Sequence, residues 1–186
     1  MDSSQSLVRT RLSLMMFFEY FIWSAWFPLA GYMPVVLGFS GKESAWIMST
    51  TALGCIVSPL LVGLIADRYF ATERVLAALH IIGGISLCLA AGQKTFAPLM
   101  TLMMINGLCY MPTLALTNSI AFRNIPDAEK DFPIIRVWGT IGWVVAGLIV
   151  GVLLGQTDNW FFYLAGGAAI LMGLYCFTLP HTPPKS

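Results

Sequence analysis

Long apolar runs, separated by short polar stretches, dominate the chain. A helix that crosses a membrane needs about 20 mostly apolar residues. Six segments meet that requirement, and they cover residues 12–37, 44–66, 75–92, 96–122, 132–155 and 160–179. The connections between them are short and leave no room for a separate soluble domain. The pattern therefore predicts an all-α polytopic membrane protein, in which residues 1–186 form a single domain of six transmembrane helices.

The composition supports a membrane protein and excludes other classes. Hydrophobic residues make up 58% of the chain and charged residues only 10%, against about 25% charged residues in an ordinary soluble domain. The 10 Lys and Arg residues nearly balance the 9 Asp and Glu residues, so the net charge gives no sign of nucleic acid as a partner. The four cysteines lie inside apolar runs and lack metal-ligand spacing. We therefore expect no disulfide framework, no metal site and no cofactor.

Basic residues are unevenly divided between the two sets of loops. With six spans both termini lie on one side of the membrane, and that side would hold Arg9, Arg11, Arg68, Arg74, Arg123, Lys130 and Lys185. The other side would hold only Lys42 and Lys94. The positive-inside rule then places both termini in the cytoplasm, for a protein of the cell (inner) membrane.

The fifth span carries a cation, a hydroxyl and an aromatic ring on one helix face. Arg136, Thr140 and Trp143 follow at i, i+4 and i+7, which are neighbouring positions on a helix. Such a face could bind a small, flat, polar molecule, because a charge inside a membrane helix is costly and usually functional. In the alternative, Arg136 reaches to the cytoplasmic surface and Trp143 only packs.

The two ends of the fifth span also carry expectations. Asp131 is expected to cap the start of this helix, with Pro133 in its first turn. Gly147, Gly151 and Gly155 follow at fourfold spacing, which predicts close contact with a neighbouring helix.

Ionisable residues also interrupt the first and third spans. Glu19 is either a protonatable coupling site or a buried hydrogen-bonding group, and Trp23 shares its helix face. Pro28 and Pro34 predict a bent or broken outer half of the first span. His80, isolated on the third span, is more typical of a structural group than of a proton relay.

The fourth span has a polar stripe. Asn106, Tyr110, Thr113 and Thr117 fall on one helix face, and Pro112 is expected to kink the helix within that stripe. Such stripes can simply hydrogen-bond helices together. Four polar groups beside a kink favour the interpretation as the wall of a cavity.

Several strings agree in order and spacing with one known family. They are Phe21-Ile-Trp-Ser-Ala-Trp26 with Gly31-Tyr32, Ala66-Asp67, Tyr110-Met-Pro-Thr-Leu114 with Asn118-Ser119, Asp131-Phe-Pro133 with Arg136-Val-Trp-Gly-Thr-Ile-Gly142, and Thr178-Leu-Pro-His181. Together they resemble the N-terminal half of the nucleoside:proton symporter family of the major facilitator superfamily. The string Gly63-Leu-Ile-Ala-Asp-Arg68 is a partial match to the cytoplasmic loop signature of that superfamily.

The resemblance implies one half of a major facilitator fold that moves nucleosides with protons by alternating access. A Phe is familiar where Trp143 stands and a Gln where Glu19 stands, so Glu19 either adds a proton site or displaces one. The expected substrate-binding residues are Arg136, Thr140, Trp143, Asn106, Tyr110 and Trp23. The expected proton-coupling candidates are Glu19 and Asp131, and the expected gating loop holds Gly63, Asp67 and Arg68.

Members of that family have about twelve spans in two halves, and this chain has six. Beyond the nucleoside, the proton and the lipid bilayer, the expected partner is therefore a second six-helix half. It could come from a homodimer, from a separate chain or from the rest of a longer protein. The alternative function is a non-transporting membrane subunit or binding module that pairs with another membrane protein. We do not expect an enzyme, because the loops lack a Gly-x-Ser-x-Gly elbow, a His-Glu-x-x-His pair and a phosphate loop.

Overall fold

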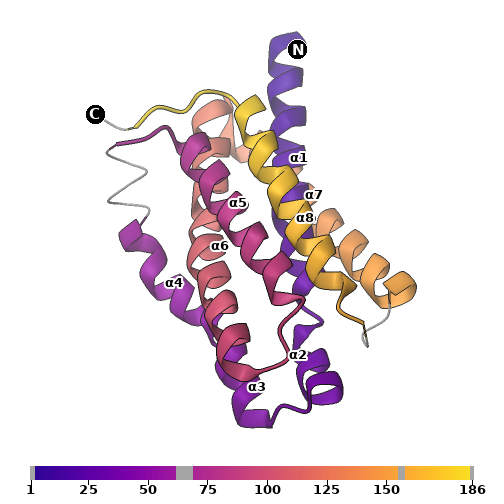
Figure 1. The fold of residues 1–186 in the computed structure, drawn as a ribbon. Coiled ribbons are helices and arrows are strands. Elements are labelled where there is room, and N and C mark those ends of the chain that lie inside the picture. The colour runs from indigo at the N-terminus through magenta and orange to yellow at the C-terminus, as the bar shows by residue number, and fades with distance from the viewer. Residues whose placement is uncertain (1–2, 62–68, 155–157, 185–186) are drawn as a thin grey trace.

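The computed structural model is a bundle of long helices, with both ends of the chain at the same end of the bundle (Figure 1). It describes residues 3–61, 69–154 and 158–184, and within these ranges there is no strand. The elements are α1 (Ser3–Trp26), α2 (Leu29–Tyr32), η1 (Met33–Leu37), α3 (Gly41–Met48), α4 (Thr50–Leu61), α5 (Thr72–Ala90), α6 (Phe96–Asn124), α7 (Ala128–Leu148), η3 (Ile149–Leu154), α8 (Trp160–Tyr175) and η4 (Cys176–Thr178).

The described residues contain five helical segments that are long and apolar enough to cross a membrane. They are Gln5–Leu37, Thr72–Ala90, Phe96–Asn124, Ala128–Val152 and Trp160–Thr178. These segments confirm the predicted all-helical membrane fold, and each overlaps one of the six predicted spans. The remaining predicted span, 44–66, corresponds to α3 and α4, which Ser49 separates, and its end lies outside the described residues.

Proline breaks the outer half of the first span, as predicted. Helix α1 ends at Trp26, Pro28 lies in the following turn, and Pro34 starts the wider π-helical turn η1. Each proline lacks the backbone N–H that would continue the regular helix. Gly38 then ends the segment with a φ of 71°, a left-handed conformation that glycine adopts without strain.

Helices that are distant in sequence pack side by side. Helix α1 packs along α7 and α8, and α5 packs between α6 and α8. An apolar core cluster that includes Leu12, Met16, Leu76, Ile120 and Met172 joins α1, α5, α6 and α8. Helix α7 contacts mainly α1, so most of its remaining surface is open.

Two glycines bring α7 against α1. A Cβ atom at Gly142 would overlap with the backbone carbonyl of Phe17, and one at Gly139 would lie 2.6 Å from the ring of Tyr20. The helices can approach this closely only because both positions lack a side chain.

The glycine contact lies earlier in α7 than the sequence predicted. Gly147 and Gly151 are both exposed, and no described atom lies within 4 Å of a Cβ placed at Gly151. Gly155 lies outside the described residues. The fourfold spacing predicted a contact at Gly147, Gly151 and Gly155. The face of α7 that α1 covers most closely lies earlier in the helix, at Gly139 and Gly142.

The start of α7 also differs from the prediction. The N-cap is Asp127, whose carboxylate accepts a hydrogen bond from the backbone N–H of Lys130 at 3.2 Å. Asp131 is therefore already inside the first turn, and the prediction that it caps the helix is wrong. Pro133 follows within the helix.

We expect Gly142→Ala to destabilise the protein by about 1–3 kcal/mol, because the added methyl group must separate α1 from α7. The matched control is Gly167→Ala on α8, where a Cβ meets nothing within 4 Å. That variant should be neutral or more stable by up to about 1 kcal/mol, since alanine is the better helix former. Thermal unfolding in detergent micelles, followed by circular dichroism, measures both changes. Equal stability of the two variants would contradict the close contact.

Candidate functional site

A buried polar cluster joins α1, α5 and α6 at the centre of the bundle. The side chain of Glu19 on α1 is 0% exposed. Its Oε2 lies 2.9 Å from Nε2 of His80 on α5, and its Oε1 accepts a hydrogen bond from the hydroxyl of Thr113 on α6. The hydroxyl of Tyr110 donates to the backbone carbonyl of Glu19. Three helices therefore converge on one carboxylate, and we call Glu19 and His80 the Glu19–His80 pair.

The polar stripe of α6 is an inward face. Asn106, Tyr110, Thr113 and Thr117 are each at most 3% exposed. Tyr110 and Thr113 bond to α1, and the hydroxyl of Thr117 donates to the backbone carbonyl of Thr113 at 2.9 Å. Within this chain two of the four side chains therefore bond α6 to α1, and the cavity wall that the sequence favoured stays a prediction.

A second group of side chains lies on the open side of the contact between α1 and α7. We call it the α1–α7 aromatic face, and it comprises Tyr20, Trp23, Arg136, Thr140 and Trp143. The Arg136 guanidinium carbon lies 3.9 Å from the centre of the Tyr20 ring. The Trp23 and Trp143 rings meet edge to face at 5.6 Å. Thr140 is exposed, and the other four are partly exposed.

A backbone contact fixes the position of Trp143. The hydroxyl of Ser24 on α1 donates to the carbonyl of Trp143 at 2.8 Å. The ring of Phe27 lies 5.8 Å from the Trp143 ring. Trp143 is thus held beside Trp23 of α1 and Phe27, which follows the end of α1, and part of its own ring stays accessible.

The charge of Arg136 lacks a carboxylate partner within the described ranges of the chain. Among those residues Arg136 makes no ion pair, and it contacts the face of Tyr20, where a cation is attracted to the ring. Glu19 bonds to His80 instead. An uncompensated cation within a membrane span requires water or a polar ligand. The arrangement therefore suits a ligand with several hydrogen-bond acceptors.

Tyr110 connects the two groups. Its ring lies 6.0 Å from the ring of Trp23 and 6.1 Å from the ring of His80. Its hydroxyl bonds to the backbone of Glu19, so the side chain is fixed between the aromatic face and the buried pair. A displacement of Trp23 would therefore be transmitted to the surroundings of Glu19.

The remaining predicted residues lie apart from this centre or outside the described residues. Oδ1 of Asp131 pairs with Nη2 of Arg9 at 3.4 Å, where α7 and α1 begin. The structure brings Asp131 into no contact with the Glu19–His80 pair. The predicted gating loop of Gly63, Asp67 and Arg68 lies outside the described residues.

Sequence reasoning underweighted His80 and missed Tyr20. A buried carboxylate needs a partner, and His80 is the single basic side chain in the third predicted span, residues 75–92. The need of the buried Glu19 carboxylate for a basic partner could therefore have predicted its contact with His80. Tyr20 could have been found from its spacing to Trp23 and Phe27 at i, i+3 and i+7, which places the three on one side of α1.

Comparison with known proteins gives consistent matches. A model of the family described as nucleoside H+ symporter matches residues 7–186. The putative nucleoside transporter YegT of Escherichia coli (strain K12) is 48% identical over 183 residues, which are 95% of this chain and 43% of that protein. The xanthosine permease of the same organism is 34% identical over 181 residues, again 95% of this chain and 43% of that protein.

A solved structure matches the fold. The crystal structure of the nucleoside transporter NupG superposes with a TM-score of 0.91 at 31% sequence identity. The match covers 95% of this chain and 45% of that one. The chain thus spans less than half the length of these relatives.

We expect His80→Ala to destabilise the protein by about 3–5 kcal/mol, because it leaves the Glu19 carboxylate buried without its partner. Glu19→Gln alone should cost less, since a neutral amide can still bond to His80 and Thr113. In the double variant the penalty of His80→Ala should fall by at least about 1 kcal/mol. Reversible unfolding in mixed micelles closes this double-mutant cycle. Strictly additive effects would show that the two side chains do not interact.

Proposed function

Because the chain belongs to the nucleoside H+ symporter family, we propose that it forms one half of a nucleoside transporter driven by protons, working by alternating access. The carrying observation is the α1–α7 aromatic face, with a cation that lacks a carboxylate partner in the described ranges. The proposal includes residues 1–186 as one six-helix domain of the inner membrane, with both termini in the cytoplasm. The protein would act as a transporter and not as an enzyme.

The aromatic face has the groups that a nucleoside requires. A nucleoside combines a flat base with a polar edge and a sugar with hydroxyl groups. The partly exposed ring of Trp143 can stack on the base. Arg136, held over Tyr20 by the face of its guanidinium, keeps its N–H edges for base carbonyls or sugar hydroxyls. Thr140 adds an exposed hydroxyl on the same face.

This face supplies one wall of a binding site. Thr140 is exposed and Arg136 and Trp143 are partly exposed in the chain by itself, so a bound nucleoside would still contact solvent. A second six-helix half opposite the face would enclose the ligand. A second copy in a homodimer, or a separate chain, could supply it around a twofold axis along the membrane normal. Asn106 and Tyr110 are buried and would act indirectly, Tyr110 through its bond to the backbone of Glu19.

The Glu19–His80 pair is the proposed proton site. Its hydrogen bond already contains one proton, and a carboxylate with a neutral imidazole has a net charge of −1. One further proton makes the pair neutral. Binding or release of one proton therefore changes the buried charge by one unit, which a coupling site requires.

Thr113 can respond to that change. Its single hydroxyl proton has two acceptors within reach, Oε1 of Glu19 and the backbone carbonyl of Tyr110. An ionised Glu19 attracts this proton, whereas an acid protonated on Oε1 donates to Thr113 and turns the hydroxyl toward Tyr110. The charge state of Glu19 is thereby connected to Tyr110, whose ring contacts Trp23 of the aromatic face.

We expect Arg136→Ala to abolish nucleoside binding, and Arg136→Lys to fail to restore it, because an ammonium cannot reproduce the guanidinium fork. Trp143→Ala should weaken binding by about 1–3 kcal/mol through lost stacking, whereas Trp143→Phe should retain most of it. Trp160→Ala, an exposed tryptophan on α8, is the matched control. Uridine and adenosine binding to the reconstituted protein is measured by scintillation proximity. Wild-type affinity in the Arg136 and Trp143 variants would remove the aromatic face from the binding site.

Glu19→Gln should uncouple transport from the proton gradient, because the amide imitates a permanently protonated acid. In liposomes that contain the chain with its second half, exchange between equal nucleoside pools should continue. Uphill uptake driven by an inward proton gradient should stop. Asp131→Asn, tested in parallel, should leave uphill uptake intact. If Glu19→Gln still concentrates nucleoside as the wild type does, the coupling carboxylate lies at Asp131 or in the second half. If no assembled form transports, the chain is a non-transporting subunit.

A further inference from the structure

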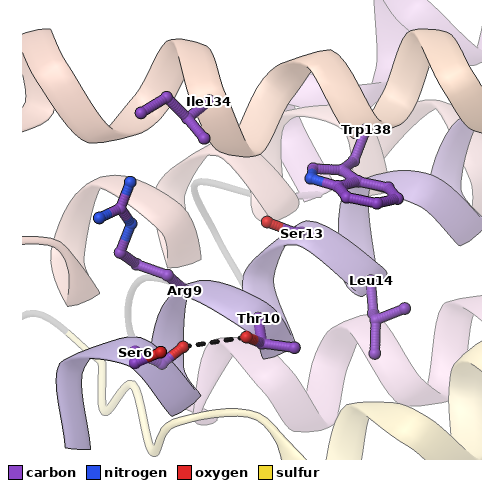
Figure 2. A pocket seen from close by; sticks show the side chains of 7 residues that line it. All are labelled: Ser6, Arg9, Thr10, Ser13, Leu14, Ile134 and Trp138. Carbon is purple, nitrogen blue, oxygen red and sulfur yellow. Dashed lines mark hydrogen bonds between the residues drawn. The ribbon is translucent and has the colours of Figure 1, made fainter. Parts of the chain in front are cut away.

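A groove follows the contact between α1 and α7 on the side opposite the aromatic face. It has a volume of about 350 Å³ and is lined by Ser6, Arg9, Thr10 and Ser13 of α1 and by Ile134 and Trp138 of α7 (Figure 2). Trp138 is two residues from Arg136 and from Thr140. Each residue rotates a helix by about 100°, so the side chain of Trp138 points to nearly the opposite side of α7 from those two. The groove therefore opens away from the proposed substrate site.

Hydroxyl groups line the α1 side of this groove. Ser6, Thr10 and Ser13 follow at i, i+4 and i+7, along one face of the helix. Thr10 donates to the backbone carbonyl of Ser6 at 3.0 Å, which Figure 2 shows as a dashed line. Within the described ranges the hydroxyls of Ser6 and Ser13 donate to no protein group. Two hydrogen-bond donors are thus available to a ligand.

Arg9 provides the positive charge of the groove. Its Nη2 lies 3.4 Å from Oδ1 of Asp131, so an ion pair across the two helices orients the guanidinium. A guanidinium has five N–H donors in a planar fork and can hold a carboxylate and a second anionic group together. Arg9 lies between Ser6 and Ser13 in the sequence, so its charge and their hydroxyls act at the same place.

The remaining lining of the groove, from both helices, is apolar and exposed. Leu14, Ile134 and Trp138 line it, and all three are exposed in the described structure. The segment that is long and apolar enough to cross a membrane starts at Gln5, so in a bilayer Ser6 and Arg9 would lie nearer the surface than Leu14. The order from polar to apolar therefore follows the depth of the bilayer, and an indole such as that of Trp138 suits the interface between the two.

We propose that this groove binds a glycerophospholipid. The phosphodiester accepts hydrogen bonds from Ser6 and Arg9, and an ester carbonyl of the glycerol backbone accepts from Ser13, about 10 Å further along α1. An acyl chain lies along Leu14, Ile134 and Trp138. The lipid covers apolar surface that the chain leaves exposed, and it bridges α1 and α7 beside the contact at Gly142. The proposal does not depend on what the aromatic face binds.

Native mass spectrometry of the purified chain in detergent micelles tests this site with two probes. Dioleoylphosphatidylglycerol should be retained, and dioleoylglycerol, which has the same acyl chains without phosphate, should be lost. The double variant Ser6→Ala/Ser13→Ala should weaken retention of the phospholipid roughly tenfold. Thr101→Ala, which removes an exposed hydroxyl on α6, is the control and should retain it like the wild type.

Two further variants separate the charge of Arg9 from its ion pair. Arg9→Gln and Asp131→Asn both remove the ion pair between α1 and α7, but only the first removes the guanidinium. Phospholipid retention should fall in Arg9→Gln and persist in Asp131→Asn. Equal retention of both probes by the wild type, or unchanged retention in the double serine variant, would overturn the proposal. Displacement of the phospholipid by inorganic phosphate at the same concentration would assign the groove to a free anion instead.

Discussion

A carboxylate in the middle of an apolar bundle constrains everything around it. Glu19 has no exposed surface, so its charge and hydrogen bonds must be satisfied by neighbouring helices. His80 and Thr113 do this from α5 and α6, and Tyr110 adds a bond to the backbone. These contacts fix the rotation of three helices about their axes. They also place Trp23 and Tyr20, one helix turn or less from Glu19, on the side that meets α7.

The contact between α1 and α7 then divides the surface into two chemically different sides. Gly139 and Gly142 allow close approach, so side chains on either flank of the contact point in opposite directions. One flank presents Arg136 and Trp143 beside aromatic rings. The other presents hydroxyls, a guanidinium and apolar side chains to the membrane. A single helix pair thus provides surfaces suited to a polar solute and to an amphipathic lipid.

The spans were predictable from the sequence because the bilayer imposes length and hydropathy on each helix separately. The face containing Arg136 and Trp143 was predictable for a related reason, since helical spacing alone places them together. Contacts between helices were not predictable in this way. The polar stripe of α6 bonds to Glu19, and the glycine contact with α1 begins at Gly139. Both features depend on which neighbouring helix covers which face, and the spacing within one helix does not contain that information. The helix start at Asp127 was missed because two acidic residues in the same stretch could each cap it.

Helix α7 is held almost entirely by one neighbour, and this has a consequence for how such proteins diversify. The Glu19–His80 pair lies on α1 and α5, whereas Arg136, Thr140 and Trp143 lie on a helix that contributes no side chain to it. Substitutions on the open face of α7 that keep the contact between Trp143 and Trp23 can therefore accumulate without altering the hydrogen bonds of Glu19. If the Glu19–His80 pair is the proton site that we propose, substitutions at such positions could change the solute while the driving force stays the same.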